Sequence, residues 1–275
     1  MLIVEKIGRV VQDFEVIRTK NIFYVDKTEF IREWRESNDA VTLITRPRRF
    51  GKTLNMSMTE QFFHWNMRGV QSCLKGFPFG KGKRIYKKID PNMDDHIATQ
   101  SLNQLSCYLS RYYRKKVIIL LDEYDTPMQE AYVHGYWEEL VSFTRSLFNS
   151  TFKTNPYIER GLMTGITRVS RESMFSDLNN LNVVTTTSDE YTTAFGFTER
   201  EVFAAMDDFG LSAQKEKTKF WYDGFIFGNQ PDIYNPWSVI NFLDKKKFGA
   251  YWTNTSSNSL AGKLIREGIP SERIR

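Results

Sequence analysis

The stretch LITRPRRFGKTLNMS (residues 43–57) ends like a phosphate-binding loop, because Gly51, Lys52 and Thr53 follow one another. Its beginning departs from the usual pattern G-x-x-x-x-G-K-[ST], since Arg46 stands where that pattern has its first glycine. Two interpretations are open at this point. The stretch is either a nucleotide site with unusual chemistry or an exposed basic turn that matches half of a motif by accident.

The residues on either side of the loop favour a nucleotide site. The run AVTLIT (residues 40–45) is short, β-branched and apolar, which predicts a buried strand. Residues 53–65 predict a helix whose apolar residues share one face: Leu54, Met58, Phe62 and Trp65. Strand, loop and helix in this order are the context that a phosphate loop requires.

The chemistry of such a loop depends on backbone N–H groups that converge on phosphate at a helix N-terminus, where the helix dipole also favours negative charge. Gly51 would let the backbone approach the anion, Lys52 would reach the β- and γ-phosphate oxygens, and the Thr53 hydroxyl would complete a magnesium shell. Pro47 removes one donor, so the cradle begins one residue later. The residues predicted to bind the nucleotide are Arg48, Arg49, Phe50, Gly51, Lys52, Thr53 and Leu54.

Arg48 and Arg49 stand inside the loop that must wrap the phosphates. A loop that lacks its first glycine and one amide donor offers fewer backbone contacts, and guanidinium groups can replace them. The alternative is that both side chains point to solvent or pair with acids elsewhere.

A second motif follows in KKVIILLDEYD (residues 115–125). Five apolar residues that end in two acids predict a central parallel strand with carboxylates at its C-terminal end. Asp122 would bind magnesium and Glu123 would act on an attacking water. Because adjacent strand residues point to opposite sides, we expect only one of the two to face the metal directly. The alternative is an ordinary strand that ends in two solvated acids.

Alternating strand and helix patterns predict an α/β fold with a mostly parallel sheet. After the acidic segment, residues 136–152 predict a helix, and the two runs 158–170 and 181–188 predict further strands. Capping boxes are predicted at Asp26 with Glu29 and at Thr198 with Glu201. Residues 76–100 are rich in Gly, Pro and Lys and predict a loop or linker.

The pattern changes near residue 195, where we place a domain boundary. Residues 1–195 are predicted to form the core, and residues 196–275 a small, mainly helical C-terminal subdomain of lid type. Within it, residues 221–243 predict an aromatic hairpin and then a helix with Asn235 as its cap and Pro236 in its first turn. The aromatic side chains of residues 220–237 are interpreted as core of this subdomain, with a nucleic-acid stacking surface as the alternative.

Composition excludes several classes of protein. With 275 residues, 41% of them hydrophobic, the chain can bury a core and is not disordered. Its net charge of +5 is small beside 38 basic and 33 acidic residues, and it indicates nucleic acid only weakly. Cys73 and Cys107 form no metal or disulfide pattern, and the N-terminus has no signal-peptide core. The longest apolar run is far shorter than the ~20 residues of a membrane span, so a cytoplasmic protein without a membrane partner is expected.

Six blocks of the sequence together resemble one known family: FYVDKTEFI, TLITRPRRFGKTLNMSM, VIILLDEYDTPM, TGITRVSRESMFSDLNNL, WYDGFIFG and YNPWSVINFL. They are similar to the AAA-ATPase-like P-loop proteins of bacteria, over about residues 7–75 and 101–260. In that family R-P-R-R-F-G-K-[ST] is the usual loop, so Arg46 is a family trait. The resemblance therefore favours the nucleotide site over the accidental match.

The resemblance implies a P-loop core of the additional-strand type, in which the Thr164 strand lies between the loop strand and the Asp122 strand. Thr164 or Thr167 would then be the polar sensor beside the γ-phosphate, with plain strand-end hydrogen bonding as the alternative. Arg168 would contact phosphate or a neighbouring subunit. Full-length family members usually carry a C-terminal nuclease-like domain. The chain stops at Arg275, before such a domain could fit, so no nuclease activity is expected of these residues.

The function expected is therefore magnesium-dependent binding of ATP, with slow hydrolysis coupled to a C-terminal effector. Adenine is favoured by the family and by the absence of an N-K-x-D sequence that would read guanine. Glu123, Lys52, Thr164 and Arg168 are the expected catalytic residues, and Thr53 and Asp122 the expected metal ligands. Further expected partners are a second copy of the chain and DNA, the latter through a missing C-terminal domain.

Two alternatives to hydrolysis stay open at this stage. One is a nucleotide-gated switch or scaffold that hardly turns over, and Glu123 is the residue that distinguishes the two. The other is a nucleic-acid-binding module that uses the basic loops 46–52, 81–88 and 245–247.

Overall fold

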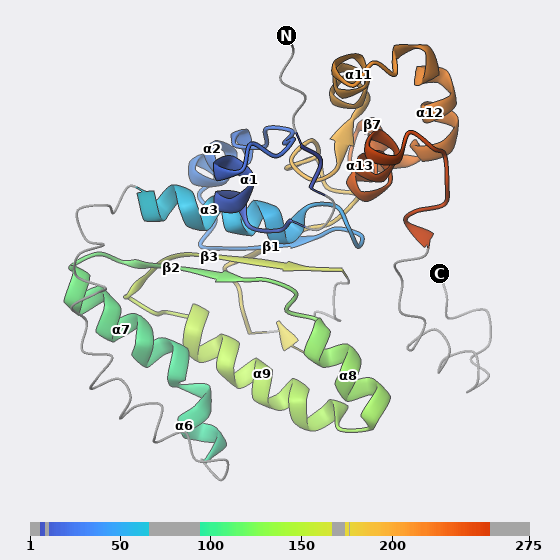
Figure 1. Cartoon of the computed structure of the whole chain (residues 1–275). Helices are drawn as coiled ribbons and strands as arrows, with labels where there is room; N and C mark the ends of the chain where they lie inside the picture. The colour runs from blue at the N-terminus through green and yellow to red at the C-terminus, as the bar shows by residue number, and fades with distance from the viewer. Residues whose placement is uncertain (1–5, 9–10, 66–93, 167–173, 176, 254–275) are drawn as a thin grey trace.

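A four-stranded parallel sheet forms the centre of the molecule, with helices on both faces (Figure 1). The computed structural model describes residues 6–8, 11–65, 94–166, 174–175 and 177–253. The strands of this sheet are β1 (Val41–Thr45), β2 (Val117–Leu121), β3 (Ile158–Gly165) and β4 (Leu181–Val184). All neighbouring pairs run parallel, which confirms the predicted α/β class.

The strand order is β2-β3-β1-β4. Strand β3, which carries Thr164, therefore lies between β1 and β2, and its expected position is confirmed. All five residues of β1 are buried, as its apolar sequence predicts. The prediction of a central strand for residues 117–121 was wrong, because within the described sheet β2 is an edge strand whose residues are half-buried. Its apolar run reflects helices on both faces of the sheet, not a central place.

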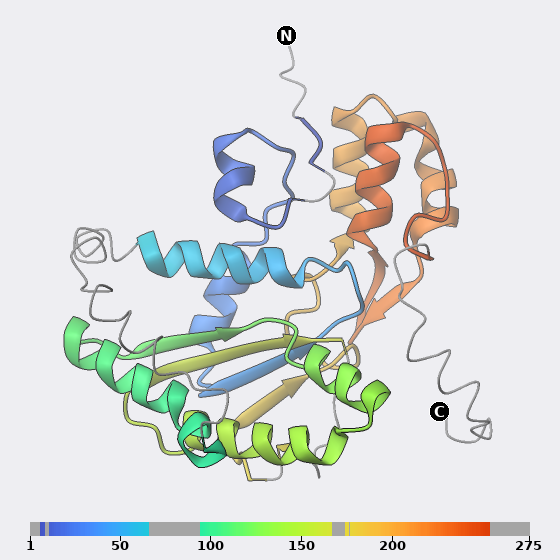
Figure 2. The same ribbon diagram turned by 60° about the horizontal axis from the view of Figure 1, so that its bottom comes forward.

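The helices form one layer above the sheet and one below it, and the two views agree (Figures 1 and 2). One layer contains α1 (Phe14–Thr19), α2 (Glu29–Glu36) and α3 (Lys52–Trp65). The other contains α6 (Asp95–Thr99), α7 (Ser101–Tyr113), α8 (Thr126–His134) and α9 (Trp137–Phe152). A separate apolar core fills each interface, and Trp34 of α2, fully buried, also donates its indole N–H to Thr42 Oγ1 at 3.1 Å.

Two local predictions in these layers were wrong. Helix α6 lies inside the stretch predicted as a loop, and Asp94 caps it by accepting the His96 N–H at 2.7 Å. The N-cap of α2 is Thr28, which has helical backbone angles and makes no side-chain cap bond. The carboxylate of Asp26 instead accepts the Thr28 N–H at 2.9 Å, one residue before the Glu29 N–H that the capping box would need.

The buried face of α3 also differs from the predicted apolar stripe. Phe62 is 36% exposed, whereas Asn55, Met56, Met58 and Thr59 are buried. The Asn55 amide reaches across to donate to the Ala194 backbone O at 2.9 Å. Contacts with distant segments, rather than the apolar periodicity of the helix, decide which of its residues face inward.

The C-terminal region (residues 196–253) combines a small antiparallel sheet with helices. Its strands, in the order β5-β7-β6, are β5 (Phe197–Thr198), β6 (Phe225–Phe227) and β7 (Gln230–Tyr234). Its helices are α11 (Glu199–Asp208), the 3-10 helix η2 (Ser212–Gln214), α12 (Lys215–Tyr222) and α13 (Pro236–Lys245). The capping box of Thr198 with Glu201 and the Asn235 cap are confirmed.

This C-terminal region lies beyond the carboxyl ends of the parallel strands (Figure 2). Phe227 and Ile233 are fully buried in the same core as Phe50 of the loop, so the region and the sheet share apolar contacts. The aromatic side chains between residues 220 and 237 belong to the core only in part, because Phe220 is 87% exposed. The domain boundary near residue 195 stays a prediction. Across the described ranges, no helix has the length and apolar character that crossing a membrane would need.

Candidate functional site

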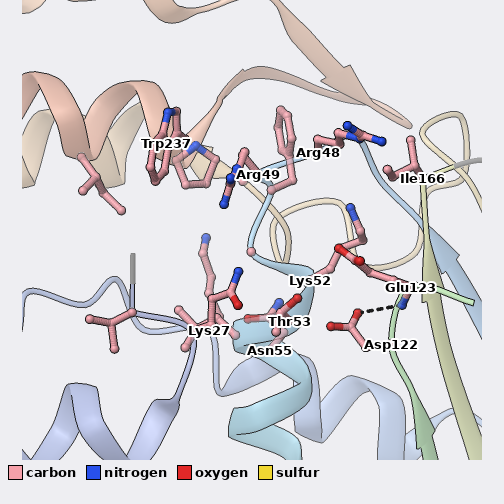
Figure 3. A pocket seen from close by; sticks show the side chains of 18 of the residues that line it. Lys27, Arg48, Arg49, Lys52, Thr53, Asn55, Asp122, Glu123, Ile166 and Trp237 are labelled. Atoms are coloured by element: carbon pink, nitrogen blue, oxygen red, sulfur yellow. Dashed lines mark hydrogen bonds between the residues drawn. The ribbon is translucent and has the colours of Figure 1, made fainter. Parts of the chain in front are cut away.

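A cavity of about 730 Å³ opens where the loop, the acids after β2 and the C-terminal region meet. The loop contributes residues 48–53, and the acids are Asp122 and Glu123 (Figure 3). The cavity is bounded by the segment before α2, one face of α8 and the start of α13. The parallel sheet thus brings together the two motifs that are about 70 residues apart in the sequence, because parallel strands end at the same edge.

Arg46, the residue in place of the first glycine, does not face this cavity. Its side chain is fully buried, and its guanidinium donates to the backbone oxygens of Thr45 at 3.0 Å, Thr185 at 2.6 Å and Glu190 at 3.3 Å. It also lies 4.7 Å from the ring centroid of Phe227. Burial lowers the pKa of Arg46 to about 10. Arg46 is therefore an internal brace that ties the loop to the segment after β4.

The rest of the loop is held from the C-terminal side. The Arg48 carbonyl accepts hydrogen bonds from Asn235 Nδ2 at 3.4 Å and from Trp252 Nε1 at 3.1 Å. The side chain of Phe50 is fully buried, and its carbonyl accepts the Gly196 N–H at 3.3 Å. Of the residues predicted to bind nucleotide, Phe50 can therefore offer a ligand only its backbone.

Two loop residues have left-handed backbone angles, Arg49 at φ +67° and Gly51 at φ +82°. A Cβ added to Gly51 would meet nothing within 4 Å, so the backbone conformation, rather than space, favours glycine there. Arg49 pays the steric cost that glycine avoids, roughly 1–2 kcal/mol for an L-residue. The guanidinium of Arg49 lies over the Trp237 ring, 4.7 Å from its centroid.

Lys52 is the first residue of α3 and is only 6% exposed. Its Nζ donates to the backbone oxygens of Arg46 and Pro47, both at 2.9 Å. Burial lowers the pKa of Lys52 to about 8, and the nearby carboxylates, Asp122 first among them, partly offset this. An ammonium group has three N–H donors, so a third is left for an anion in the cavity.

Asp122 and Glu123 both line the cavity. Both residues follow β2, which ends at Leu121, so the alternation of a strand does not decide their directions, and the expectation that only one of them faces the metal stays a prediction. Glu123 has a left-handed backbone, at φ +51°. The Glu123 N–H donates to Asp122 Oδ1 at 3.1 Å, the dashed line in Figure 3. This bond orients the Asp122 carboxylate, while Glu123 Oε2 accepts the Thr126 hydroxyl at 3.4 Å.

Thr164 supports this turn from β3. It is 1% exposed, its hydroxyl donates to Asp122 Oδ1, and its Oγ1 lies 3.4 Å from the Glu123 backbone N. The structure therefore places Thr164 behind the acids rather than on the wall of the cavity. Thr167 and Arg168 lie outside the described residues.

Several residues on the cavity wall have no motif that predicts them. Lys27 is buried, and its Nζ donates to both carboxylate oxygens of Glu201 at 2.7 Å and to the Thr193 backbone O at 2.7 Å. Burial lowers the pKa of Lys27, an effect that Glu201 opposes. Gln129, on α8, accepts a hydrogen bond from Arg48 at 3.5 Å. Sequence signals existed for Lys27, which lies in the block FYVDKTEFI, and for the lining residue Trp237, which lies in the block YNPWSVINFL.

The donor set fits magnesium better than a softer metal. Thr53 and Asp122, the two expected ligands, offer oxygen atoms to the same cavity. Within the described ranges no group of three or more His, Cys, Asp or Glu side chains could hold a metal ion. Magnesium commonly uses only one or two protein ligands and completes its shell with substrate phosphates and water. The residues present are therefore compatible with magnesium that arrives with a phosphorylated ligand.

Comparison with known proteins adds two matches. The family model described as "Predicted AAA-ATPase" matches residues 7–88 and 79–175, which together make up more than half of the chain. A curated protein of Azotobacter chroococcum mcd 1, described as "Uncharacterized protein in vnfD 5'region", is 24% identical over 291 residues. That alignment covers 94% of this chain and 55% of the relative, so the chain spans about half of the relative's length. No solved structure matches the chain.

Proposed function

Because the chain belongs to the predicted AAA-ATPase family, we propose that it is a magnesium-dependent ATP-binding domain that hydrolyses ATP slowly. We further propose that the parallel sheet is a P-loop core of the additional-strand type. The observation that carries the proposal is the shared cavity. Gly51, Lys52 and Thr53 reach it from the start of α3, and Asp122 and Glu123 reach it from the end of β2.

The loop would hold the phosphates. The first N–H groups of a helix have no partner within the helix. The start of α3 lines the cavity, so these N–H groups and the positive end of the helix dipole are available to phosphate there. Lys52 supplies one charge from a buried position, where it is worth more than at the surface. Arg48 and Arg49 supply further donors at the same wall.

Thr53 and Asp122 would hold magnesium together with the phosphate oxygens. The ion, when bound, neutralises charge on the phosphates. Glu123 lies next to Asp122 on the cavity wall, where it can orient a water and accept its proton. Thr164 keeps the Asp122 carboxylate in place through its hydroxyl. From the family resemblance, Arg168 is proposed to contact phosphate or a neighbouring subunit.

A nucleotide-gated switch without much turnover is a second candidate, and one observation favours it. The Arg48 carbonyl is bound by Asn235 and Trp252, so the loop that would bind phosphate is in direct contact with the C-terminal region. A change in the loop on nucleotide binding would alter these bonds. In both versions the readout is a C-terminal effector, and DNA and a second copy of the chain are proposed as partners of the complete assembly.

The test is magnesium-dependent ATP turnover by the purified chain, with and without DNA, together with calorimetric ATP binding. Lys52→Ala should weaken ATP binding on the order of 10- to 100-fold, as expected for the loss of a charged hydrogen bond. Its thermal melting should stay close to that of the wild type. Unchanged ATP affinity in this variant would contradict the proposal that the loop is the nucleotide site.

Glu123→Gln should bind ATP and turn it over much more slowly. The matched control is Glu130→Gln, the same change at a cavity-wall acid on α8 that is 62% exposed at its side chain. This control should keep its turnover. Turnover unchanged in Glu123→Gln would point to another base, and binding without turnover in the wild type would favour the switch.

A further inference from the structure

The cavity has an apolar side away from Asp122 and Glu123. Val11, Phe23 and Val25 line it from the segment before α2, and Phe197, Trp237 and Ile240 line it from the C-terminal region. These two groups belong together, because Phe23 and Val25 pack against the apolar core of the C-terminal region. An apolar side next to a cationic loop fits a ligand with a flat apolar part and an anionic part.

Trp237 lies at the start of α13 and lines this side of the cavity (Figure 3). Its indole N–H already donates to the Tyr251 backbone O at 3.2 Å, so the hydrogen-bond donor at the edge of the ring already has an acceptor. The start of α13 is fixed by the Asn235 cap and by Pro236 in the first turn, which holds the ring in one place. The face of the ring is what the residue can offer to a ligand.

That face now carries the guanidinium of Arg49, 4.7 Å from the ring centroid. Arg49 is itself a loop residue next to the amides that would bind phosphate. A guanidinium that lies over an indole face is attracted by the ring, but this contact does not use the N–H groups of the guanidinium. Those N–H groups can still donate to a charged acceptor, which binds them more strongly. Phosphate oxygens in the loop would be such an acceptor.

We infer that Trp237 is the platform on which the base of the nucleotide stacks, and that Arg49 covers this platform until phosphates draw it into the loop. This inference rests on the proposed ATP site and adds the residue that recognises the base. Every nucleobase has a π-face, so the platform contributes affinity for a nucleotide over a bare polyphosphate rather than a choice among bases.

The test compares ATP with inorganic tripolyphosphate, titrated calorimetrically into the full chain at the same magnesium concentration. Trp237→Leu should weaken ATP binding on the order of 10-fold, the range measured for loss of one base stack. Tripolyphosphate binding should be equal or tighter in this variant, because Arg49 is no longer held on the ring. Trp237→Phe should retain most of the ATP affinity.

The matched control is Trp221→Leu, which removes a 43% exposed tryptophan of α12 that does not line the cavity, and it should leave both affinities unchanged. The movement of Arg49 away from the ring can be followed by tryptophan fluorescence. The contribution of Trp237 is the difference in emission between the wild type and Trp237→Phe. Adding tripolyphosphate alone should change this difference, because Arg49 leaves the ring.

Equal losses for ATP and tripolyphosphate in Trp237→Leu would overturn the platform and leave the ring as a support for the loop. Unchanged ATP affinity would place the base elsewhere. A wild type that binds neither ligand would overturn the proposed function and the platform together. A wild type that binds both ligands, without the selective loss, would overturn only the platform.

Discussion

The two ends of the loop formed by residues 46–53 both carry positively charged side chains, but these side chains have different roles. At the front end, residues 46–47, the Arg46 guanidinium is fully buried and bound by backbone oxygens. At the rear end, residues 48–53 line the cavity, Phe50 through its backbone and with its side chain in the core. Three arginines within four positions therefore divide between holding the loop and facing its ligand.

What separates the two ends is the partner that each finds in the fold. The front end meets the segment after β4, whose carbonyls satisfy a guanidinium without a carboxylate. At the rear end, Arg49 lies over the Trp237 ring and Lys52 lies near Asp122. The positive charges of these two residues therefore stay on the cavity wall. A basic residue near a phosphate motif is thus not by itself a phosphate ligand. Five predictions would break or sharpen this division.

The largest effect is expected for Arg46→Met, which keeps the length of the side chain and removes its donors. Three backbone oxygens lose their partner in a buried place. The free energy of unfolding should fall by about 3 kcal/mol or more. Urea titration of the ligand-free protein measures it.

Arg48→Met is the matched control for that change. Its side chain is half-buried, whereas that of Arg46 is fully buried, so the free energy of unfolding should fall by clearly less than it does for Arg46→Met. Equal losses at the two positions would break the division between the front and rear ends.

The next effect concerns the rear end and ATP. Neutralising both rear arginines, Arg48→Gln with Arg49→Gln, should weaken ATP binding by about 1.5–3 kcal/mol for each charged hydrogen bond that is lost. Binding of adenosine, which has no phosphate, should change little. Equal ATP affinity in the double variant and the wild type would count against any direct role of these arginines.

A third effect is the pH dependence of ATP binding. Burial lowers the pKa of Lys52 to about 8, so the ligand-free protein loses this charge as the pH rises through that value. ATP affinity should then fall by about tenfold, or ~1.4 kcal/mol, per pH unit above it. The same slope should persist in the double arginine variant, because arginine does not titrate in this range. A flat affinity from pH 7 to 9 would contradict a charged role for Lys52.

The stability of the ligand-free protein should show the opposite trend. The folded pKa of Lys52 lies below its ordinary value of 10.5, so between about pH 8 and 10.5 the unfolded chain binds the proton that the folded chain has released. The free energy of unfolding must therefore rise with pH in this window. The cost of burying the charge is fully present below it. Lys52→Met should flatten the rise in urea titrations at several pH values.

The smallest effect is expected for Trp252→Phe, which removes the N–H that binds the Arg48 carbonyl at 3.1 Å. Loss of one neutral hydrogen bond should lower the free energy of unfolding by about 0.5–1.5 kcal/mol. ATP binding should respond as well if the C-terminal region holds the rear end of the loop in its binding form. A change in stability with no change in ATP affinity would restrict this contact to folding.

Local sequence was enough to locate the main elements. The strands β1 and β2, the loop between β1 and α3, and the caps Thr198 and Asn235 all follow from patterns a few residues long. Residue identity likewise marked Lys52 and the two acids as candidates for one site. These features depend on neighbours in the chain, and the chain itself specifies them.

Tertiary packing decided what each residue touches. It made β2 an edge of the described sheet, buried Arg46 and Phe50, and put Thr164 behind Asp122. It also brought Lys27 and Trp237 to the cavity from segments about 200 residues apart in the sequence. The physical reason is that burial and hydrogen-bond partners are properties of surfaces that meet only after folding. The sequence alone thus determined which residue types could bind a phosphorylated ligand, and the fold alone decided which of them face it.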